Sequence, residues 1–102
     1  MKVKDKLNQG NWCKGSWGKD KEGKSVGADS PNMCKMCLKT ACFKAEGIFS
    51  VKSFAIRMAI KDLFPSRLPT DYPRFIDEIT HFNDHKDTTW EDIEQVLELA
   101  DV

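Results

Sequence analysis

The stretch that decides the fold is Asp29 to Ala45, which reads Asp-Ser-Pro-Asn-Met-Cys-Lys-Met-Cys-Leu-Lys-Thr-Ala-Cys-Phe-Lys-Ala. Its apolar and small residues recur at the i, i+3, i+4 and i+7 spacing of one helical face. That face comprises Cys34, Cys37, Leu38, Ala41, Cys42 and Ala45, and a second row of Met36, Thr40 and Phe43 widens it. Because only a strip around Lys35, Lys39 and Glu46 is clearly polar, the pattern predicts a helix that other parts of the chain surround.

Both ends of this predicted helix carry boundary signals. Ser30 is suited to accept a hydrogen bond from an amide of the first turn, and Pro31 suits the first helical position. Gly47 suits the left-handed residue that follows a last turn. We therefore expect a helix over 29–45 at the centre of the domain.

A second helix is predicted over 51–64. Its polar residues Ser53, Arg57 and Lys61 form one stripe at i, i+4 and i+8. Apolar residues occupy most of the remaining circumference, so we expect this helix to be largely buried and paired with the first. Pro65 ends it, because proline cannot continue the hydrogen-bond ladder of a helix.

Two further amphipathic helices are predicted in the C-terminal part of the chain. One opens at Thr70 or Asp71 and ends near residue 82; its inner face comprises Tyr72, Phe75, Ile76, Ile79 and Phe82. Residues 83–87 form a polar loop, and Thr88-Thr89-Trp90-Glu91 fits a capping box for the last helix. That helix is expected to point Trp90, Ile93, Val96, Leu97 and Ala100 inward.

The N-terminal part has a different character. The glycine-rich segment 12–28 argues against a helix, and Asp20-Lys21-Glu22-Gly23 fits a turn that joins two short extended arms. Residues 1–11 fit either a short helix that stops at Gly10 or an extended lead-in. Trp12 and Trp17 are expected to pack over the helical core, whereas an exposed pair would indicate the anchors of a binding surface.

Together these elements predict a mainly α fold in a single globular domain, 1–102. We expect a small bundle of about four helices, with a helical core over 29–102 and an N-terminal hairpin or glycine-rich loop segment over 1–28. Leu38, Ile60 and Ile79 are expected in the core.

The composition favours a soluble protein. Hydrophobic residues make up 40% of the chain and charged residues 31%, and no apolar run approaches the roughly 18 residues of a transmembrane helix. The first seven residues have no apolar core like that of a signal peptide. We therefore expect a cytoplasmic protein with no membrane contact and with reduced cysteines.

The net charge is zero, but the two halves differ in sign. Residues 1–52 contain 11 lysines and 5 acidic residues, whereas residues 53–102 contain 5 basic and 11 acidic residues. The halves could attract each other within the fold, or the basic half could contact an acidic protein. A nucleic acid is the less expected partner, because the basic half contains no arginine and base readout commonly uses arginine.

Four cysteines raise the question of zinc. Cys34-x-x-Cys37 has ligand-like spacing, and His81-x-x-x-His85 could supply two more ligands. However, 43 residues separate the two pairs, and Cys34, Cys37 and Cys42 lie on the expected core stripe, where a reduced cysteine behaves as a small hydrophobe. We expect no metal and no other cofactor.

Signatures of catalysis are weak. Cys13 is the cysteine expected to be least buried, and His81 or His85 could act as its base, but two histidines in a chain of this length mean little. No phosphate-binding glycine loop, nucleophile elbow or dinucleotide fingerprint is present.

A series of short motifs, in order along the chain, carries a resemblance. These are Trp12-x-x-Gly15, Asp20-x-x-Gly23, Asp29-x-Pro31, Cys37-Leu38-x-x-Ala41 and Phe82-Asn83-Asp84 followed by a threonine-capped helix. The pattern resembles domain of unknown function 6197, a family of small bacterial and phage proteins, over nearly the whole chain. It departs at Thr40, where the family usually has glycine, and in the shortened segment 1–11. The resemblance implies the layout but no activity.

Two functions of different class follow. The favoured one is a non-enzymatic binding protein whose partner is another protein, such as a phage or mobile-element factor that binds or inhibits a host protein. The alternative is a small enzyme or ligand-binding domain with a site between the Trp12 loop and Asn83-Asp84. The candidate binding residues are Trp12, Lys14, Trp17, Asp20, Asn83 and Asp84. For Asn83-Asp84, we expect hydrogen bonds that shape the turn, with contact to a ligand as the alternative.

Overall fold

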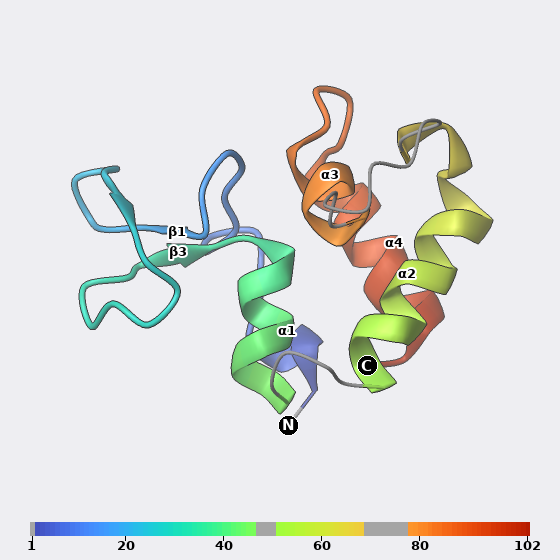
Figure 1. Cartoon of the computed structure of the whole chain (residues 1–102), viewed down its shortest axis with the longest axis horizontal. Helices are drawn as coiled ribbons and strands as arrows, with labels where there is room; N and C mark the ends of the chain where they lie inside the picture. The colour runs from blue at the N-terminus through green and yellow to red at the C-terminus, as the bar shows by residue number, and fades with distance from the viewer. Residues whose placement is uncertain (1, 47–50, 69–77) are drawn as a thin grey trace.

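The computed structural model describes residues 2–46, 51–68 and 78–102. Figure 1 shows a small sheet on one side of the molecule and the longer helices on the other. The elements, in chain order, are the 3-10 helix η1 (Val3–Asp5), the strands β1 (Gly18–Lys19), β2 (Ser25–Val26) and β3 (Lys35–Met36), the helices α1 (Leu38–Glu46) and α2 (Val51–Leu63), the 3-10 helix η2 (Pro65–Arg67), and the helices α3 (Glu78–Asp84) and α4 (Trp90–Ala100). The mainly α fold with an N-terminal hairpin is confirmed.

The central helix is shorter than the sequence predicts. We expected it over 29–45, but α1 begins at Leu38, and residues 35 and 36 form β3 instead. This strand pairs antiparallel with β1, in the register Gly18 opposite Met36 and Lys19 opposite Lys35. The pairing stabilises an extended backbone where helical spacing of the side chains favoured a helix.

The expected start of that helix is a turn. The Ser30 amide donates to the Gly27 carbonyl at 3.1 Å, and the Ser30 hydroxyl accepts from the Asn32 amide at 3.2 Å. Ser30 therefore caps a local turn rather than a helix. As a consequence Cys34, which we placed on the core stripe, is exposed.

The remainder of the central stripe is confirmed. Its buried members are Cys37, Leu38, Thr40, Ala41 and Cys42. Phe43, which we placed in the second apolar row, is instead 40% exposed. The predicted terminal Gly47 lies outside the described residues.

Helix α2 matches its prediction within one residue, and the helix ends before Pro65, as expected. Its inner face comprises Ile56, Ala59 and Ile60, which are buried. The helix lies mainly against α4, then against α3, and only then against α1, so the expected pairing with the central helix is a minor contact. The expectation that α2 is buried around most of its circumference is wrong, because Phe54 and Met58 are 61% and 44% exposed.

Helix α3 extends further than expected. It includes Asn83 and Asp84, which we placed in a loop. The expected start of this helix, at Thr70 or Asp71, lies outside the described residues.

Helix α4 has the predicted type of cap, displaced by one residue. Thr89 is the N-cap and Asp92 the third helical residue, so the box is not Thr88 with Glu91. The Thr89 amide donates to the Asp92 carboxylate at 3.1 Å. Of the predicted inner face, Ile93, Val96 and Leu97 are buried, and Trp90 and Ala100 pack partly buried against the core.

The core joins both ends of the described chain. Leu38, Ile60 and Ile79 are fully buried, as predicted. Within residues 2–11, the described backbone has one 3-10 turn, η1, in place of a helix that runs to Gly10 or an extended lead-in. This turn buries Val3, whose amide donates to the Val102 carbonyl at 2.5 Å.

The hairpin is confirmed. Strands β1 and β2 pair antiparallel, and the sheet order is β2-β1-β3. At the turn, Asp20 Oδ1 accepts from the amides of Glu22 and Lys24, both at 2.9 Å. Gly23 has φ +83°, a left-handed conformation that glycine adopts readily.

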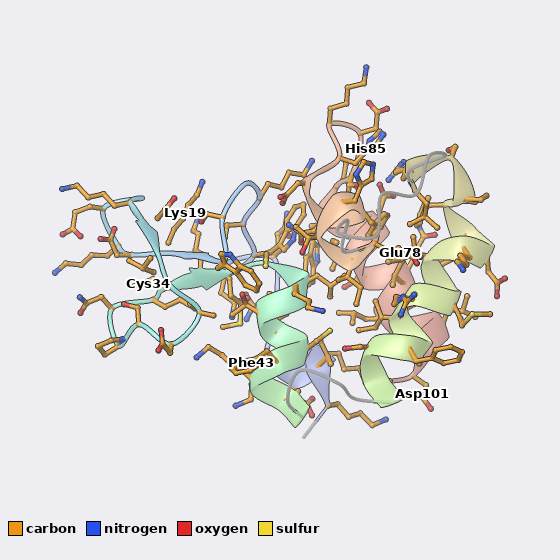
Figure 2. All side chains as sticks on the ribbon, in the orientation of Figure 1. Lys19, Cys34, Phe43, Glu78, His85 and Asp101 are labelled. Atoms are coloured by element: carbon orange, nitrogen blue, oxygen red, sulfur yellow. The ribbon has the colours of Figure 1, made fainter. Side chains whose placement is uncertain are left out.

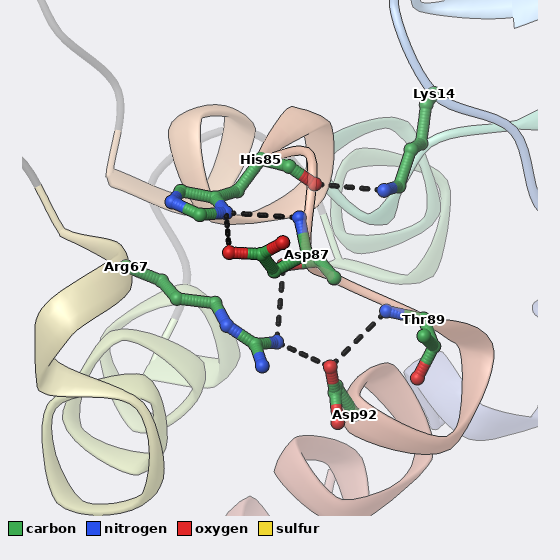
Figure 3. Close-up of polar contacts among 7 residues, drawn as sticks. Lys14, Arg67, His85, Asp87, Thr89 and Asp92 are labelled. Carbon is green, nitrogen blue, oxygen red and sulfur yellow. Dashed lines mark hydrogen bonds and ion pairs between the residues drawn. The ribbon is translucent and has the colours of Figure 1, made fainter.

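Arg67 links η2 to the start of α4 (Figure 3). Its guanidinium lies 4.6 Å from the Phe64 ring centroid and donates to both Thr88 Oγ1 and the Asp92 carboxylate. Partial burial alone would raise the pKa of Asp92, but the hydrogen bonds from Arg67 and Thr89 outweigh burial, so the pKa is lowered.

This lowered pKa predicts a loss of stability in acid. A depressed native pKa gives a contribution that is fully present above the unfolded pKa of about 3.9 and is lost as the pH falls through the native pKa. Asp92→Asn should therefore lower the melting temperature at pH 7, and its difference from wild type should shrink on acidification below about pH 4. Thermal melts across this range test the prediction, with Glu94→Gln, an exposed carboxylate on the same helix, as control. A difference between Asp92→Asn and wild type that is constant with pH would contradict it.

Candidate functional site

Asn83 occupies the last turn of α3 and is fully buried. Its Oδ1 accepts from the indole Nε1 of Trp12 at 2.7 Å and from the Leu38 amide at 3.0 Å. Its Nδ2 donates to the Cys13 carbonyl at 3.0 Å and to Asp84 Oδ1 at 2.9 Å. All four hydrogen-bonding positions of the amide group are therefore used. We call this arrangement the Asn83 clasp.

The clasp explains where α1 begins. The first amides of a helix have no partner within the helix and need one from elsewhere. The Leu38 amide finds it in Asn83, which is 45 residues away in sequence. The Thr40 amide contacts Cys37 Sγ at 3.4 Å, and the Ala41 amide donates to the Cys37 carbonyl at 3.1 Å.

Asp84 and Lys14 extend the same junction. Asp84 Oδ1 accepts from the amide of Gly15 at 2.9 Å, and Gly15 has φ +78°. Lys14 Nζ donates to the His85 carbonyl at 2.7 Å (Figure 3) and lies 5.8 Å from the Trp12 ring centroid. The predicted site residues Trp12, Lys14, Asn83 and Asp84 are thus brought together.

The other two predicted site residues lie elsewhere. Asp20 shapes the hairpin turn, as described above. Trp17 is 54% exposed, so the expectation that it packs over the helical core is wrong. Trp12 is partly buried against the core and lies 6.1 Å from Trp90 between ring centroids, as expected for a packed indole.

A small hollow lies beside Asp84. Its volume is about 170 Å³, and its lining comprises Gly15, Ser16, Trp17, Cys37, Thr80 and Asp84. Binding sites for drug-sized ligands usually exceed about 300 Å³. This hollow is therefore small for a substrate, and its lining does not include Trp12, Lys14 or Asp20.

A larger and more apolar groove lies between the hairpin and α1. Its volume is about 360 Å³, and it is lined by Trp17, Gly27, Ala28, Lys39 and Phe43. We call it the Trp17–Phe43 groove. Figure 2 shows Phe43 on α1, beside the part of the molecule that carries the sheet.

The sheet register explains the shape of this groove. Gly18 lies opposite Val26, and continuing the antiparallel register by one residue places Trp17 opposite Gly27. Because Gly27 has no side chain, the space beside the indole is left open.

Two lysines face each other on the sheet. Lys19 lies directly opposite Lys35 across β1 and β3, and neither forms an ion pair within the described residues. Like charges placed directly opposite each other destabilise a strand pair. Since side chains alternate along a strand, Lys19 lies on the same face as Trp17, near the groove.

The cysteines differ from their predicted exposure. We expected Cys13 to be the least buried, but it is 7% exposed, whereas Cys34 is the exposed cysteine. Burial, and next the neighbouring Cys37, raise the pKa of the Cys13 thiol, which lowers the fraction of reactive thiolate at neutral pH.

The rings of His81 and His85 lie 6.3 Å apart. Over 2–46, 51–68 and 78–102, no three His, Cys, Asp or Glu residues form a group that could hold a metal ion.

Sequence reasoning missed Gly27, Ala28, Lys39 and Phe43 as groove residues. The signal for Phe43 was hidden, because its helical spacing also fits a widened core face. Only the alternative interpretation of Trp17, as an exposed anchor, pointed to this surface.

Among the described helices, none is long and apolar enough to cross a membrane.

Comparison with known families supports the resemblance. The family model described as "Family of unknown function (DUF6197)" matches residues 2–101. The chain belongs to this family. No curated protein and no solved structure matches the chain.

Proposed function

We propose that this chain is a small non-enzymatic binding protein that engages an acidic segment of another protein. One large apolar side chain of that segment is seated in the Trp17–Phe43 groove. The observation that carries the proposal is the exposure of two aromatic side chains, 54% for Trp17 and 40% for Phe43, on one apolar groove.

The size and lining of the groove support an apolar anchor. Its volume of about 360 Å³ is at the lower end of the range of about 300 to 1,000 Å³ found for ligand sites. A single side chain is smaller than a drug-sized ligand and fits such a space. Tryptophan is also among the residues that contribute most to binding energy at protein interfaces.

The charges near the groove support an acidic partner. Lys19 and Lys35 lie opposite each other without an ion pair among the described residues, so their repulsion is relieved when carboxylates approach. Lys39 adds a third positive charge on the lining itself. A host protein that is occupied or inhibited by a phage or mobile-element factor is one partner of this class.

The alternative, a ligand site between the Trp12 loop and Asn83-Asp84, has less support. The Asn83 amide group is fully used within the protein, and the hollow beside Asp84 is about 170 Å³. The junction is better explained as a structural contact between the N-terminal loop and α3.

A displayed library of random peptides tests the proposal, because it does not require a known partner. We expect enrichment of peptides that combine several acidic residues with one large apolar residue. Trp17→Ala should weaken binding of an enriched peptide by about thirtyfold, which corresponds to about 2 kcal/mol. Phe54→Ala is the matched control, because Phe54 is an exposed aromatic on α2, outside the groove lining, and should leave the Kd unchanged.

Charge reversal tests the second half of the proposal. Lys19→Glu combined with Lys35→Glu should weaken the same peptide and make binding less sensitive to salt. Selection of peptides without acidic residues, or equal affinity in Trp17→Ala and wild type, would contradict the proposal. Tighter binding of duplex DNA than of any acidic peptide would move the function to nucleic-acid binding.

A further inference from the structure

Cys13 and Cys37 are placed side by side by a parallel bridge. Trp12 pairs with Met36 in this bridge. The Met36 amide donates to the Asn11 carbonyl at 2.7 Å, and the Cys13 amide donates to the Met36 carbonyl at 3.0 Å. Continuing this parallel register by one residue places Cys13 opposite Cys37. Neighbouring strands lie about 4.8 Å apart, and residues paired in register point to the same face.

The surroundings of the two thiols agree with this placement. Cys13 Sγ contacts the Ser16 carbonyl at 3.8 Å, and Ser16 and Cys37 line the same hollow of about 170 Å³. After burial, the neighbouring Cys37 is the next cause that raises the pKa of the Cys13 thiol. Both cysteines are free thiols.

The adjacent motif Cys34-x-x-Cys37 does not provide such a pair. Cys34 and Cys37 flank β3, and a strand rises about 3.3 Å per residue, which separates their Cα atoms by about 10 Å. A disulfide requires a Cα separation below about 7 Å. The spacing Cys34-x-x-Cys37 is typical of redox motifs, but the intervening strand holds these two cysteines too far apart to form a disulfide. The neighbour of Cys37 in the fold is Cys13.

We propose that Cys13 and Cys37 form a dithiol site that exchanges with low-molecular-weight disulfides, such as oxidised glutathione, to give an intramolecular disulfide. Cys37 reacts first, because it borders the hollow. Its thiol loses a proton and the thiolate attacks one reagent sulfur; a new S–S bond forms, the reagent S–S bond breaks, and one reagent thiolate leaves.

The second exchange completes the reaction. The Cys13 thiol loses its proton and attacks the Cys37 sulfur of the mixed disulfide, which expels the second reagent thiolate. The protein loses two electrons and two protons, and the reagent becomes two thiols. The resulting bond joins the two ends of the segment 13–37, which contains Trp17 and all three strands and ends directly before α1. We expect this closure to raise the melting temperature by restricting the unfolded chain.

The test uses the full chain with Cys34→Ser, which removes the exposed thiol. The native protein is titrated with mixtures of oxidised and reduced glutathione, and free thiols are then blocked. We expect a mass loss of about 2 Da before blocking, since two hydrogens leave. Peptide mapping should identify a Cys13 to Cys37 cross-link, and the oxidised form should melt several degrees higher than the reduced form.

Two cysteine variants and a sample unfolded in urea distinguish a disulfide formed at this site from nonspecific oxidation. In the same background, Cys37→Ser and Cys13→Ser should each abolish the cross-link. The mapping itself needs neither variant, so the test holds even if one of them folds poorly. A cross-link that involves Cys42, a cross-link that forms only after unfolding in urea, or no cross-link in strongly oxidising mixtures would overturn the proposal.

Discussion

Asn83→Ala is expected to lower the free energy of unfolding by about 3 to 5 kcal/mol. The change removes the partner of the Trp12 indole, of the Leu38 amide and of the Cys13 carbonyl at once. Each buried polar group left without a partner costs about 1 to 3 kcal/mol. Because Asn83 has no exposed surface, water can reach these groups only if the structure opens locally.

Urea unfolding followed by circular dichroism measures this loss. Two graded variants give the comparison: Trp12→Phe removes one donor and should cost about 1 kcal/mol, and Asp84→Ala should cost about 0.5 to 2 kcal/mol, the range for a cap-like hydrogen bond. If Asn83→Ala were no more destabilising than Asp84→Ala, the clasp would not hold the junction together.

Phe82→Ala is expected to cost about 3 to 5 kcal/mol, the range for removal of a buried aromatic ring from a packed core. Phe82 has no exposed surface and lies 5.5 Å from Phe64 between ring centroids, with the rings stacked at 25°. Its removal opens a cavity between α3 and the segment that follows α2.

The same unfolding experiment with Phe54→Ala provides the matched control. Phe54 is 61% exposed, so its truncation should change stability by no more than about 0.5 kcal/mol. Similar losses for both phenylalanines would mean that the core assignment is wrong.

Helix α2 was predictable because its cause is local. Its polar stripe and Pro65 both lie within or beside the helix, and they fix its extent without any distant partner. The extent to which α2 is buried was not predictable in the same way. Its apolar residues occupy nearly the whole circumference, but the rest of the protein covers only one side of the helix. Phe54 and Met58 remain on the surface for that reason.

The start of α1 was not predictable from spacing. The same residues fit a helix from 29 onward, but strand pairing with Gly18 and Lys19 holds residues 35 and 36 extended. The cap of the observed helix comes from Asn83. Both interactions join residues that are far apart in sequence, so they cannot be inferred from the residues around position 37 alone.

The candidate site shows the same division. The sequence placed the Trp12 loop and Asn83-Asp84 together as an alternative, and the structure does bring them into contact. What the sequence could not give is that Asn83 lies inside a helix with its amide fully used. The groove was hidden because it depends on the pairing of the hairpin and on the distance between β1 and α1.

Opposite charges of the two halves meet where η1 lies beside the end of α4. Lys2 and Lys4 lie 3.2 and 3.6 Å from the Asp101 carboxylate, and Lys2, followed by Lys4, lowers the pKa of Asp101. These pairs are exposed, so they contribute little to stability. The lysines near the groove, Lys19 and Lys35, take no part in this contact, and they are the ones that the proposed binding would use.

The three indole N–H signals in a nitrogen–proton NMR spectrum give the most direct test of the proposed binding surface. We predict that titration with an acidic peptide selected on the protein shifts the Trp17 signal. The Trp12 signal, whose proton is held by Asn83, and the Trp90 signal should stay in place. A shift of the Trp12 signal with an unchanged Trp17 signal would contradict the account and place the binding site at the Asn83 clasp.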